Sequence, residues 1–213
     1  MKFLLLMLPV LVLFVVGCGP KLVQQEELDA LGYKTIFQVD AATGLKQGAS
    51  QQFDPQGNLV HEEMYLDDQL HGERRIYDPE GNVVVVENYE KNQFAGEYLN
   101  YDNSGNLTLK GQYINGAMNK TWFQYYADGG VMESVTFVNN ETNGPFREWY
   151  ENGKPKASGN YAAESKEDGI LHLYLETGGL ERVMQCSIGM CQTIWTPDST
   201  GTAPEGFDMT RPE

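Results

Sequence analysis

Histidine, cysteine and basic side chains are all scarce in this 213-residue chain. The sequence contains three cysteines and three histidines, His61, His71 and His172. None of the histidines stands at metal-ligand spacing from a cysteine or another histidine, so the sequence predicts no metal site. We expect partly exposed histidines of strands and turns. No Gly-x-Ser-x-Gly, P-loop or His-Glu-x-x-His motif occurs, and no catalytic residue or cofactor is predicted.

Paired carboxylates are the one arrangement that acid–base chemistry could use. Glycosidases place two carboxyl groups on either side of a bond, and Glu62-Glu63 and Asp67-Asp68 supply adjacent acids. In a chain with 30 acidic residues, such pairs are more often solvated edges of strands. The sequence therefore predicts that the protein is not an enzyme.

The shortage of basic residues limits the possible partners. The chain has 15 Lys and Arg against 30 Asp and Glu, a formal charge of −15. A surface of this sign repels phosphate, which argues against nucleic acid as a partner. Binding to anionic lipid needs basic clusters, and none is present. The charge favours solubility and resistance to self-association.

Long hydrophobic runs are also missing, apart from one at the N-terminus. Residues 3–16 are apolar and follow Met1-Lys2, the profile of a secretory signal, and are short of the roughly 20 residues that span a bilayer. The run ends in Val15-Val16-Gly17-Cys18, which resembles the bacterial lipobox. The resemblance implies that residues 1–17 are removed and that Cys18 carries the lipid, including palmitate. The alternative is an uncleaved N-terminal anchor.

The residue after the cysteine bears on localisation. It is Gly19 rather than Asp, and by resemblance to enterobacterial lipoproteins this implies sorting to the outer membrane. We expect a protein that is lipid-anchored there and faces the periplasm. Removal of residues 1–17 takes away Lys2 and no acid, so the charge stays negative and the lipid alone would hold the protein to the membrane.

The rest of the chain is organised by a repeat. An aromatic residue recurs every 12 positions through ten rungs: Phe53, Tyr65, Tyr77, Tyr89, Tyr101, Tyr113, Tyr125, Phe137, Trp149 and Tyr161. A one-residue insertion near Lys166 then shifts the frame, and Cys186 stands where the twelfth rung is due. Self-similarity at a fixed period is the signature of a repeat architecture.

Each 24-residue unit, such as residues 72–96, contains two strand signals. Apolar residues alternate with period two, as at Val83, Val85 and Tyr89. Asp-Pro-x-Gly-Asn at 54–58 and 78–82 is typical of hairpin turns, and Asp-Asn-Ser-Gly-Asn at 102–106 lacks the closing Glu of an EF-hand. The other connection, such as residues 90–96, is expected to be longer. Two short connections per repeat predict an all-β fold, an elongated antiparallel meander that forms a twisted sheet.

These signals divide the chain into four parts. Residues 1–17 are the signal peptide, and residues 18–32 are the lipidated cysteine and a polar tether without strand alternation. Residues 33–195 are the repeat domain, beginning with a degenerate strand at 33–39. Residues 196–213 are expected to be a disordered C-terminal tail.

The repeat frame resembles the MORN-repeat family, and most closely its bacterial variant with Gly-x-aromatic-x-x-aromatic-x-x-x-Gly-x-Leu units. The resemblance covers about residues 44–180. It implies a repeat sheet and a role as a scaffold or partner-binding module, while bacterial members are often labelled antitoxins or exported proteins. Few Lys and Arg residues lie within the repeats, so a lipid-headgroup role is not implied.

Aromatic residues outside the ladder are the candidates for a binding face. In the middle repeats the rung has an aromatic partner three residues earlier, on the opposite face of the strand. We expect the rungs to form the core through cross-strand packing. Tyr98, Trp122, Phe146 and Tyr150 are predicted to form an exposed partner-binding surface.

Two cysteines remain once Cys18 is lipidated. Cys186 and Cys191 are an even pair in an exported protein, where thiols tend to be oxidised, and Ser187-Ile188-Gly189-Met190 suits a hairpin loop. The sequence predicts a disulfide across the last hairpin; the alternative is two free thiols or a redox pair.

Two functions fit these observations. The first is a lipid-anchored envelope binding or scaffold module whose sheet meets a protein or an envelope polymer. The second is a periplasmic immunity protein, antitoxin-like, that neutralises a secreted toxin.

Overall fold

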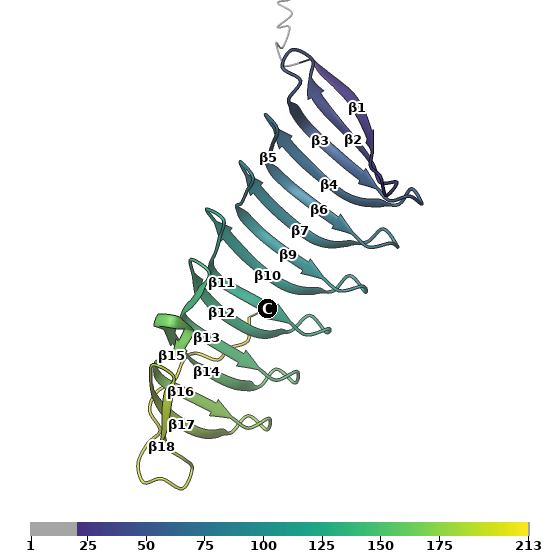
Figure 1. Ribbon diagram of the computed structural model, residues 1–213. Coiled ribbons are helices and arrows are strands. Elements are labelled where there is room, and N and C mark those ends of the chain that lie inside the picture. Colours follow the sequence, from purple (N-terminus) through teal and green to yellow (C-terminus); the bar gives the residue numbers. More distant parts are fainter. Residues whose placement is uncertain (1–20, 213) are drawn as a thin grey trace, which may run out of the picture.

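The computed structural model describes residues 21–212, which form one open sheet of antiparallel strands (Figure 1). The first nine strands are β1 (Leu22–Leu28), β2 (Lys34–Asp40), β3 (Lys46–Phe53), β4 (Leu59–Leu66), β5 (Gln69–Leu70), β6 (Gly72–Tyr77), β7 (Val83–Glu90), β8 (Gln93–Phe94) and β9 (Gly96–Tyr101). The other nine are β10 (Leu107–Ile114), β11 (Ala117–Tyr125), β12 (Val131–Val138), β13 (Glu141–Trp149), β14 (Pro155–Ala162), β15 (Lys166–Glu167), β16 (Gly169–Tyr174), β17 (Leu180–Ser187) and β18 (Met190–Trp195). The predicted all-β meander is confirmed. The predicted signal peptide and Cys18 lie outside the described residues.

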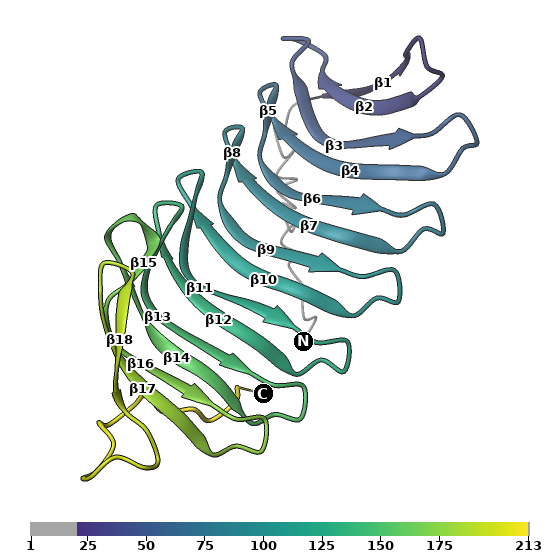
Figure 2. The ribbon, with the colours of Figure 1, turned by 60° about the horizontal axis from the view of Figure 1, so that its bottom comes forward.

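Successive strands pair with one another along the whole sheet. We call each strand position across the sheet a row. Three rows are divided, each into a short strand followed by a longer one: β5 and β6 both pair with β4, β8 and β9 with β7, and β15 and β16 with β14. A 3₁₀ turn, η1 (Ala163–Ser165), occupies the connection before β15. The result is an elongated, curved and twisted sheet (Figure 2). Within residues 21–212, no helix is long and apolar enough to cross a membrane.

A glycine opens most of the repeats, and in the divided rows it stands at the start of the longer strand. Gly72, Gly96 and Gly169 begin the longer pieces of the divided rows, with φ angles of 107°, 93° and 91°. Residues with a Cβ rarely adopt this backbone conformation, and glycine adopts it without steric cost. The recurring glycine of the sequence therefore suits the backbone at this position, which Lys120 also occupies with a φ of 62° in the following repeat.

The Asp-containing connections are tight turns closed by the aspartate. The Asn58 amide donates to Asp54 Oδ1 at 2.8 Å, and the Asn82 amide donates to Asp78 Oδ1 at 2.8 Å. The side-chain hydrogen bond from Asn58 also helps to hold the pKa of Asp54 below its usual value. The carboxylates thus serve the turns, as the sequence predicts.

The connections at the other edge of the sheet are shorter than expected. Between β7 and β8 the turn consists of Lys91 and Asn92, both with positive φ (51° and 65°). Residues 93–94 then pair with the end of β7 as β8, so the predicted long connection is wrong. Asn92 Oδ1 accepts a hydrogen bond from the Leu70 amide at 2.7 Å, which ties one turn to its neighbour.

The chain before the repeats also differs from the prediction. Residues expected to be a tether form β1, which pairs with β2 along its full length, from Leu22 opposite Asp40 to Leu28 opposite Lys34. All seven residues of β1 are exposed. Backbone pairing rather than burial holds this strand, so its sequence lacks the hydrophobic alternation from which a strand could be predicted.

The two faces of the sheet carry different sets of aromatic rings. Adjacent residues of a strand point to opposite faces, so Trp122 and Phe123 mark the two. The Trp122 ring contacts the rings of Tyr98, Tyr113 and Phe137. The Phe123 ring instead contacts the ring of Tyr125. We call the side of Trp122 the aromatic face. The rungs of the ladder therefore alternate between faces.

The opposite side is here called the tail face. Directly paired residues share a face, and Val135 lies opposite both Trp122 and Phe146. Phe146 is therefore on the aromatic face, and Trp149, three residues later in the same strand, is on the tail face with Tyr125. Aromatics on both sides of the middle repeats were predicted, and this prediction is confirmed.

Candidate functional site

Two of the four predicted partner-binding residues are buried. The exposed fractions of Trp122 and Phe146 are 4% and 3%. A Cβ on Gly111 would overlap the indole ring of Trp122, and a Cβ on Gly159 would lie 2.8 Å from the Phe146 ring. Each ring thus covers a glycine of the neighbouring strand. The prediction that Trp122 and Phe146 are exposed is wrong.

The other two are half-buried and have partners within the sheet. Tyr98 packs against Tyr113 and Trp122, with ring centroids 5.9 and 5.7 Å apart. The Tyr150 hydroxyl donates to the carbonyl oxygen of Tyr174 at 2.9 Å and so ties two turns together. The four residues do not form one exposed aromatic surface, and their role in partner binding stays a prediction.

A small cavity of about 170 Å³ opens on the aromatic face beside Trp122, Phe137 and Glu133. Burial raises the pKa of Glu133, and the charge of Glu148 on the paired strand adds to this effect. Glu148 itself bonds to Lys156, with Nζ and Oε2 2.6 Å apart. The carboxylates of Glu133 and Glu148 are therefore part of the packed surface of the sheet.

A charged cluster lies between β4, β6 and β7. Glu63 is 3.7 Å from His61 Nε2 and 3.6 Å from Arg74 Nε, and Arg74 Nη1 is 3.7 Å from Glu87. Burial by itself would raise the pKa of Glu63, but hydrogen bonds from His61 and Tyr65 outweigh it and leave the pKa lowered. Arg74 lies between both acids, and the cluster is an ion-pair network. No group of three or more potential metal ligands lies together anywhere in residues 21–212.

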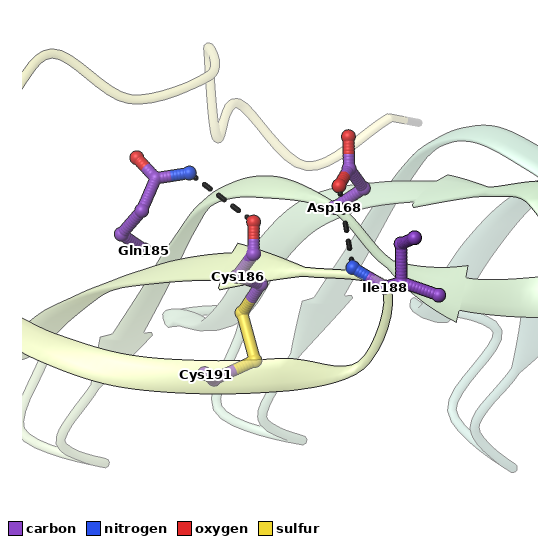
Figure 3. Close-up of a disulfide and its surroundings, with 5 residues drawn as sticks. All are labelled: Asp168, Gln185, Cys186, Ile188 and Cys191. Atoms are coloured by element: carbon purple, nitrogen blue, oxygen red, sulfur yellow. Dashed lines mark hydrogen bonds between the residues drawn. A yellow bond between two sulfur atoms is a disulfide. The ribbon is translucent and has the colours of Figure 1, made fainter.

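The predicted disulfide is present. Cys186 and Cys191 are directly opposite in β17 and β18 and are bonded to each other (Figure 3). The Ile188 amide donates to Asp168 Oδ1 at 3.3 Å, which attaches the hairpin turn to the preceding row. The turn between the two strands comprises only Ile188 and Gly189. The bond closes the last hairpin of the array, and no strand follows it in the part of the chain that the structure describes.

The C-terminal segment contains the least expected feature of the molecule. Residues 196–212 leave β18 and run back towards the middle of the sheet (Figure 1). The Trp149 indole nitrogen donates to the Met209 carbonyl and Arg147 Nε to the Asp208 carbonyl, each at 3.0 Å. The predicted disordered tail is wrong: this segment, here called the tail, is attached to the array.

The tail buries part of the sheet beneath it. His172, which was expected to be partly exposed, is 2% exposed, and its Nε2 lies 3.0 Å from the Pro204 carbonyl oxygen. A carbonyl only accepts, so Nε2 carries the proton. Trp149 is fully buried, and the Phe207 ring lies 5.1 Å from the Arg147 guanidinium carbon. A cavity of about 420 Å³ remains between the tail and β14 to β16.

The end of the tail is held by Arg211. Its Nε donates to the Val131 carbonyl at 2.8 Å, and its guanidinium carbon lies 5.6 Å from the centre of the Tyr126 ring. A Cβ on Gly130 would overlap the guanidinium, and one on Gly153 would lie 3.3 Å from Nη1. We call the space between these groups the arginine slot. Sequence periodicity cannot reveal it, because the tail lies outside the repeat.

Together these contacts define the candidate site: a strip of the tail face, from β12 to β16, that holds an extended segment. Its donors, Arg147, Trp149 and His172, all reach backbone carbonyls of that segment. Any residue supplies a backbone carbonyl, so selection of side chains falls to the arginine slot and to the contact between Arg147 and the Phe207 ring. The fold and site thus define an open β-repeat array that holds the C-terminal segment of its own chain against one face.

The comparisons with known proteins identify the repeats. The chain carries MORN repeat variants, with the family model matching residues 70–91, 95–115 and 142–163. The segments coincide with β6–β7, β9–β10 and β13–β14, so each match is one two-stranded unit. No match was found among curated proteins. Among solved structures, a porin-like protein from Bacteroides uniformis is 8% identical over 81% of this chain and 92% of its own. Its TM-score of 0.21 is too low to indicate a shared fold.

Proposed function

We propose that the protein is a lipid-anchored envelope module that binds a protein or an envelope polymer through its repeat sheet. MORN repeats suggest a protein- or membrane-binding module, and their β-meander is not a known enzyme fold. The observation that supports binding most directly is the attachment of residues 204–209 to the tail face by three side-chain donors. A surface that holds one extended segment in this way is suited to hold another.

The anchor is the part of the proposal that rests on the sequence. With a lipobox-like Val-Val-Gly-Cys at 15–18 and no basic cluster, attachment through Cys18 is the simplest route to a membrane. We expect Cys18→Ser to block processing and leave residues 1–17 on the chain. The wild type should partition into detergent and incorporate palmitate. A wild-type protein that is soluble and unlabelled would contradict the anchor.

Binding in the envelope can be tested by photo-crosslinking from a chosen face. A photoreactive phenylalanine analogue at Tyr125 reports on the tail face next to the tail, and the same analogue at Glu80, in an exposed turn, serves as the control. We expect an adduct from position 125 and none from position 80. Absence of an adduct from position 125, with turnover of some substrate, would overturn the proposal.

The acidic surface favours a second candidate, a periplasmic immunity protein. A charge of −15 suits the inhibition of a basic toxin, because opposite charges speed association. An immunity gene sits beside the gene of its toxin. The product of the neighbouring gene, exported to the periplasm, should then kill cells only when this protein is absent. Survival of cells both with and without this protein would rule the candidate out.

A further inference from the structure

The arginine slot is a built feature of one position in the array. The turns on this edge share the same frame, and the residue after the turn glycine is Asn58, Asn82, Asn106, Gly130, Lys154 or Gly179 in successive repeats. In the early turns the asparagine side chain occupies the space and bonds to the turn aspartate, as Asn58 Nδ2 does to Asp54 at 2.9 Å. Gly130 leaves that space open.

A cationic side chain also occupies the neighbouring position. Lys154 extends across Gly178, where an added Cβ would lie 3.0 Å from the lysine Cδ, and its Nζ donates to the Thr177 carbonyl at 2.8 Å. Between Gly130 and Gly153 the array supplies no such side chain of its own, and Arg211 of the tail enters instead. The space between adjacent turns therefore accepts a basic side chain, and at Gly130 this must come from outside the array.

The tail is an incomplete ligand for this slot. Arg211 Nη2 is buried without a hydrogen-bond partner among residues 21–212. The tail also brings two carboxylates, Glu205 and Asp208, onto an array that is already strongly acidic. A segment with the same arginine but more basic neighbours would meet a more favourable field.

We propose that the strip under the tail is an arginine-anchored peptide-binding site, that the tail occupies it in cis, and that an extended, arginine-containing segment of a partner protein replaces the tail. This inference rests on the proposed function and identifies the partner chemistry. The donors Trp149, Arg147 and His172 hold the backbone of either segment, and the slot between Gly130 and Gly153 selects the arginine. Tyr126 stays in place because its hydroxyl donates to the Trp149 carbonyl at 2.8 Å.

The test uses the full chain with the tail released in place. In Arg211→Ala the anchor is lost, and hydrogen exchange of the Trp149 indole N–H, which donates to the Met209 carbonyl in the wild type, should become fast. A fluorescent peptide with the sequence of residues 203–213 is then added, and its anisotropy is measured. We expect the peptide to bind Arg211→Ala at least tenfold more tightly than the wild type, whose own tail competes, since a hydrogen bond from a charged group contributes about tenfold or more.

Two matched comparisons show whether the slot is responsible. A peptide in which the arginine is replaced by alanine should lose at least tenfold in affinity. Gly130→Ala, added to Arg211→Ala, should close the slot and abolish binding, whereas Gly179→Ala at the equivalent turn should leave binding unchanged, because a Cβ there meets nothing within 4 Å. If Gly130→Ala does not fold, the two peptides still decide the question.

Three results would overturn the inference: a Trp149 indole N–H that stays protected in Arg211→Ala, a peptide that binds wild type and variant equally, or equal affinity for the arginine and alanine peptides. The assay contains only purified protein and peptide. Its failure is therefore distinguishable from failure of the proposed function, which would appear as absent envelope adducts while the peptide still binds.

Discussion

At the scale of single residues, the sheet is held together by rings that lie on glycines. Trp122 covers Gly111, and a Cβ at Gly111 would overlap the indole. The φ angle of Gly111 is not positive, so alanine is excluded by space and not by backbone conformation. We expect Gly111→Ala to lower the free energy of unfolding by about 1–3 kcal/mol, the usual cost of overpacking a core.

A denaturant titration checks this, with Gly179→Ala as the control. Nothing lies within 4 Å of a Cβ at position 179, so this variant should remain within about 0.5 kcal/mol of wild type or be slightly stabilised. Equal stability of the two variants would show that Trp122 does not need the space above Gly111.

The raised pKa of Glu133 makes the stability of the fold depend on pH. Burial and then repulsion from Glu148 raise its pKa above the ordinary 4.5, so the folded chain holds this proton more tightly than the unfolded chain. The stability that this carboxyl contributes is therefore lost as the pH rises from about 4.5 through the raised folded pKa. We expect Glu133→Gln to raise the Tm at pH 7 and to have no such effect at pH 4.

The comparison for this prediction is Glu90→Gln, which removes one charge from an exposed strand end. Loss of any negative charge from so acidic a chain relieves some repulsion, and the control measures that general effect. A Tm gain of the same size for both variants at pH 7 would contradict the specific role of Glu133.

The residues that sequence reasoning misplaced show where a periodic pattern stops being informative. A 12-residue period predicts which residues are rungs, and period two predicts that Phe146 and Trp149 lie on opposite faces. It does not predict that Gly159 lies under Phe146, since this depends on strand register. Nor does it predict the tail, whose contacts mostly use backbone carbonyls that leave no mark in a sequence.

At the scale of elements, the last hairpin has only one neighbouring row. β17 is paired on both sides, whereas β18 is paired only with β17. The Cys186–Cys191 disulfide therefore constrains a strand that has a single partner. The two-strand unit itself was predictable from period and turn chemistry, and β1 was not, because an exposed strand carries no hydrophobic alternation.

Reduction of this disulfide should affect the end of the array and leave its middle unchanged. Closing so short a loop contributes about 2 kcal/mol in the chain-entropy picture. We expect dithiothreitol to speed hydrogen exchange of β18 while β7 to β12 exchange as before, because repeats interact mainly with their neighbours. The paired serine variant, Cys186→Ser with Cys191→Ser, should behave like the reduced protein; a uniform change along the sheet would argue against local action.

At the scale of the whole molecule, the array is elongated. Strands follow one another along the long axis, and within residues 21–212 the chain returns only in the tail (Figures 1 and 2). A compact domain of this length has a radius of gyration of about 17 Å. Small-angle X-ray scattering should therefore give a clearly larger value, and a radius near 17 Å would contradict the extended sheet.

Because the tail returns to the arginine slot, the length of the tail is linked to the length of the sheet between that slot and β18. Each added two-stranded repeat lengthens the sheet by about 10 Å. Duplication of a repeat before β12 would leave the distance from β18 to the arginine slot unchanged. The same duplication after β13 would move the chain end away from Gly130, beyond what residues 196–212 now span. The array is thus free to grow during evolution only on its N-terminal side, unless the tail lengthens with it.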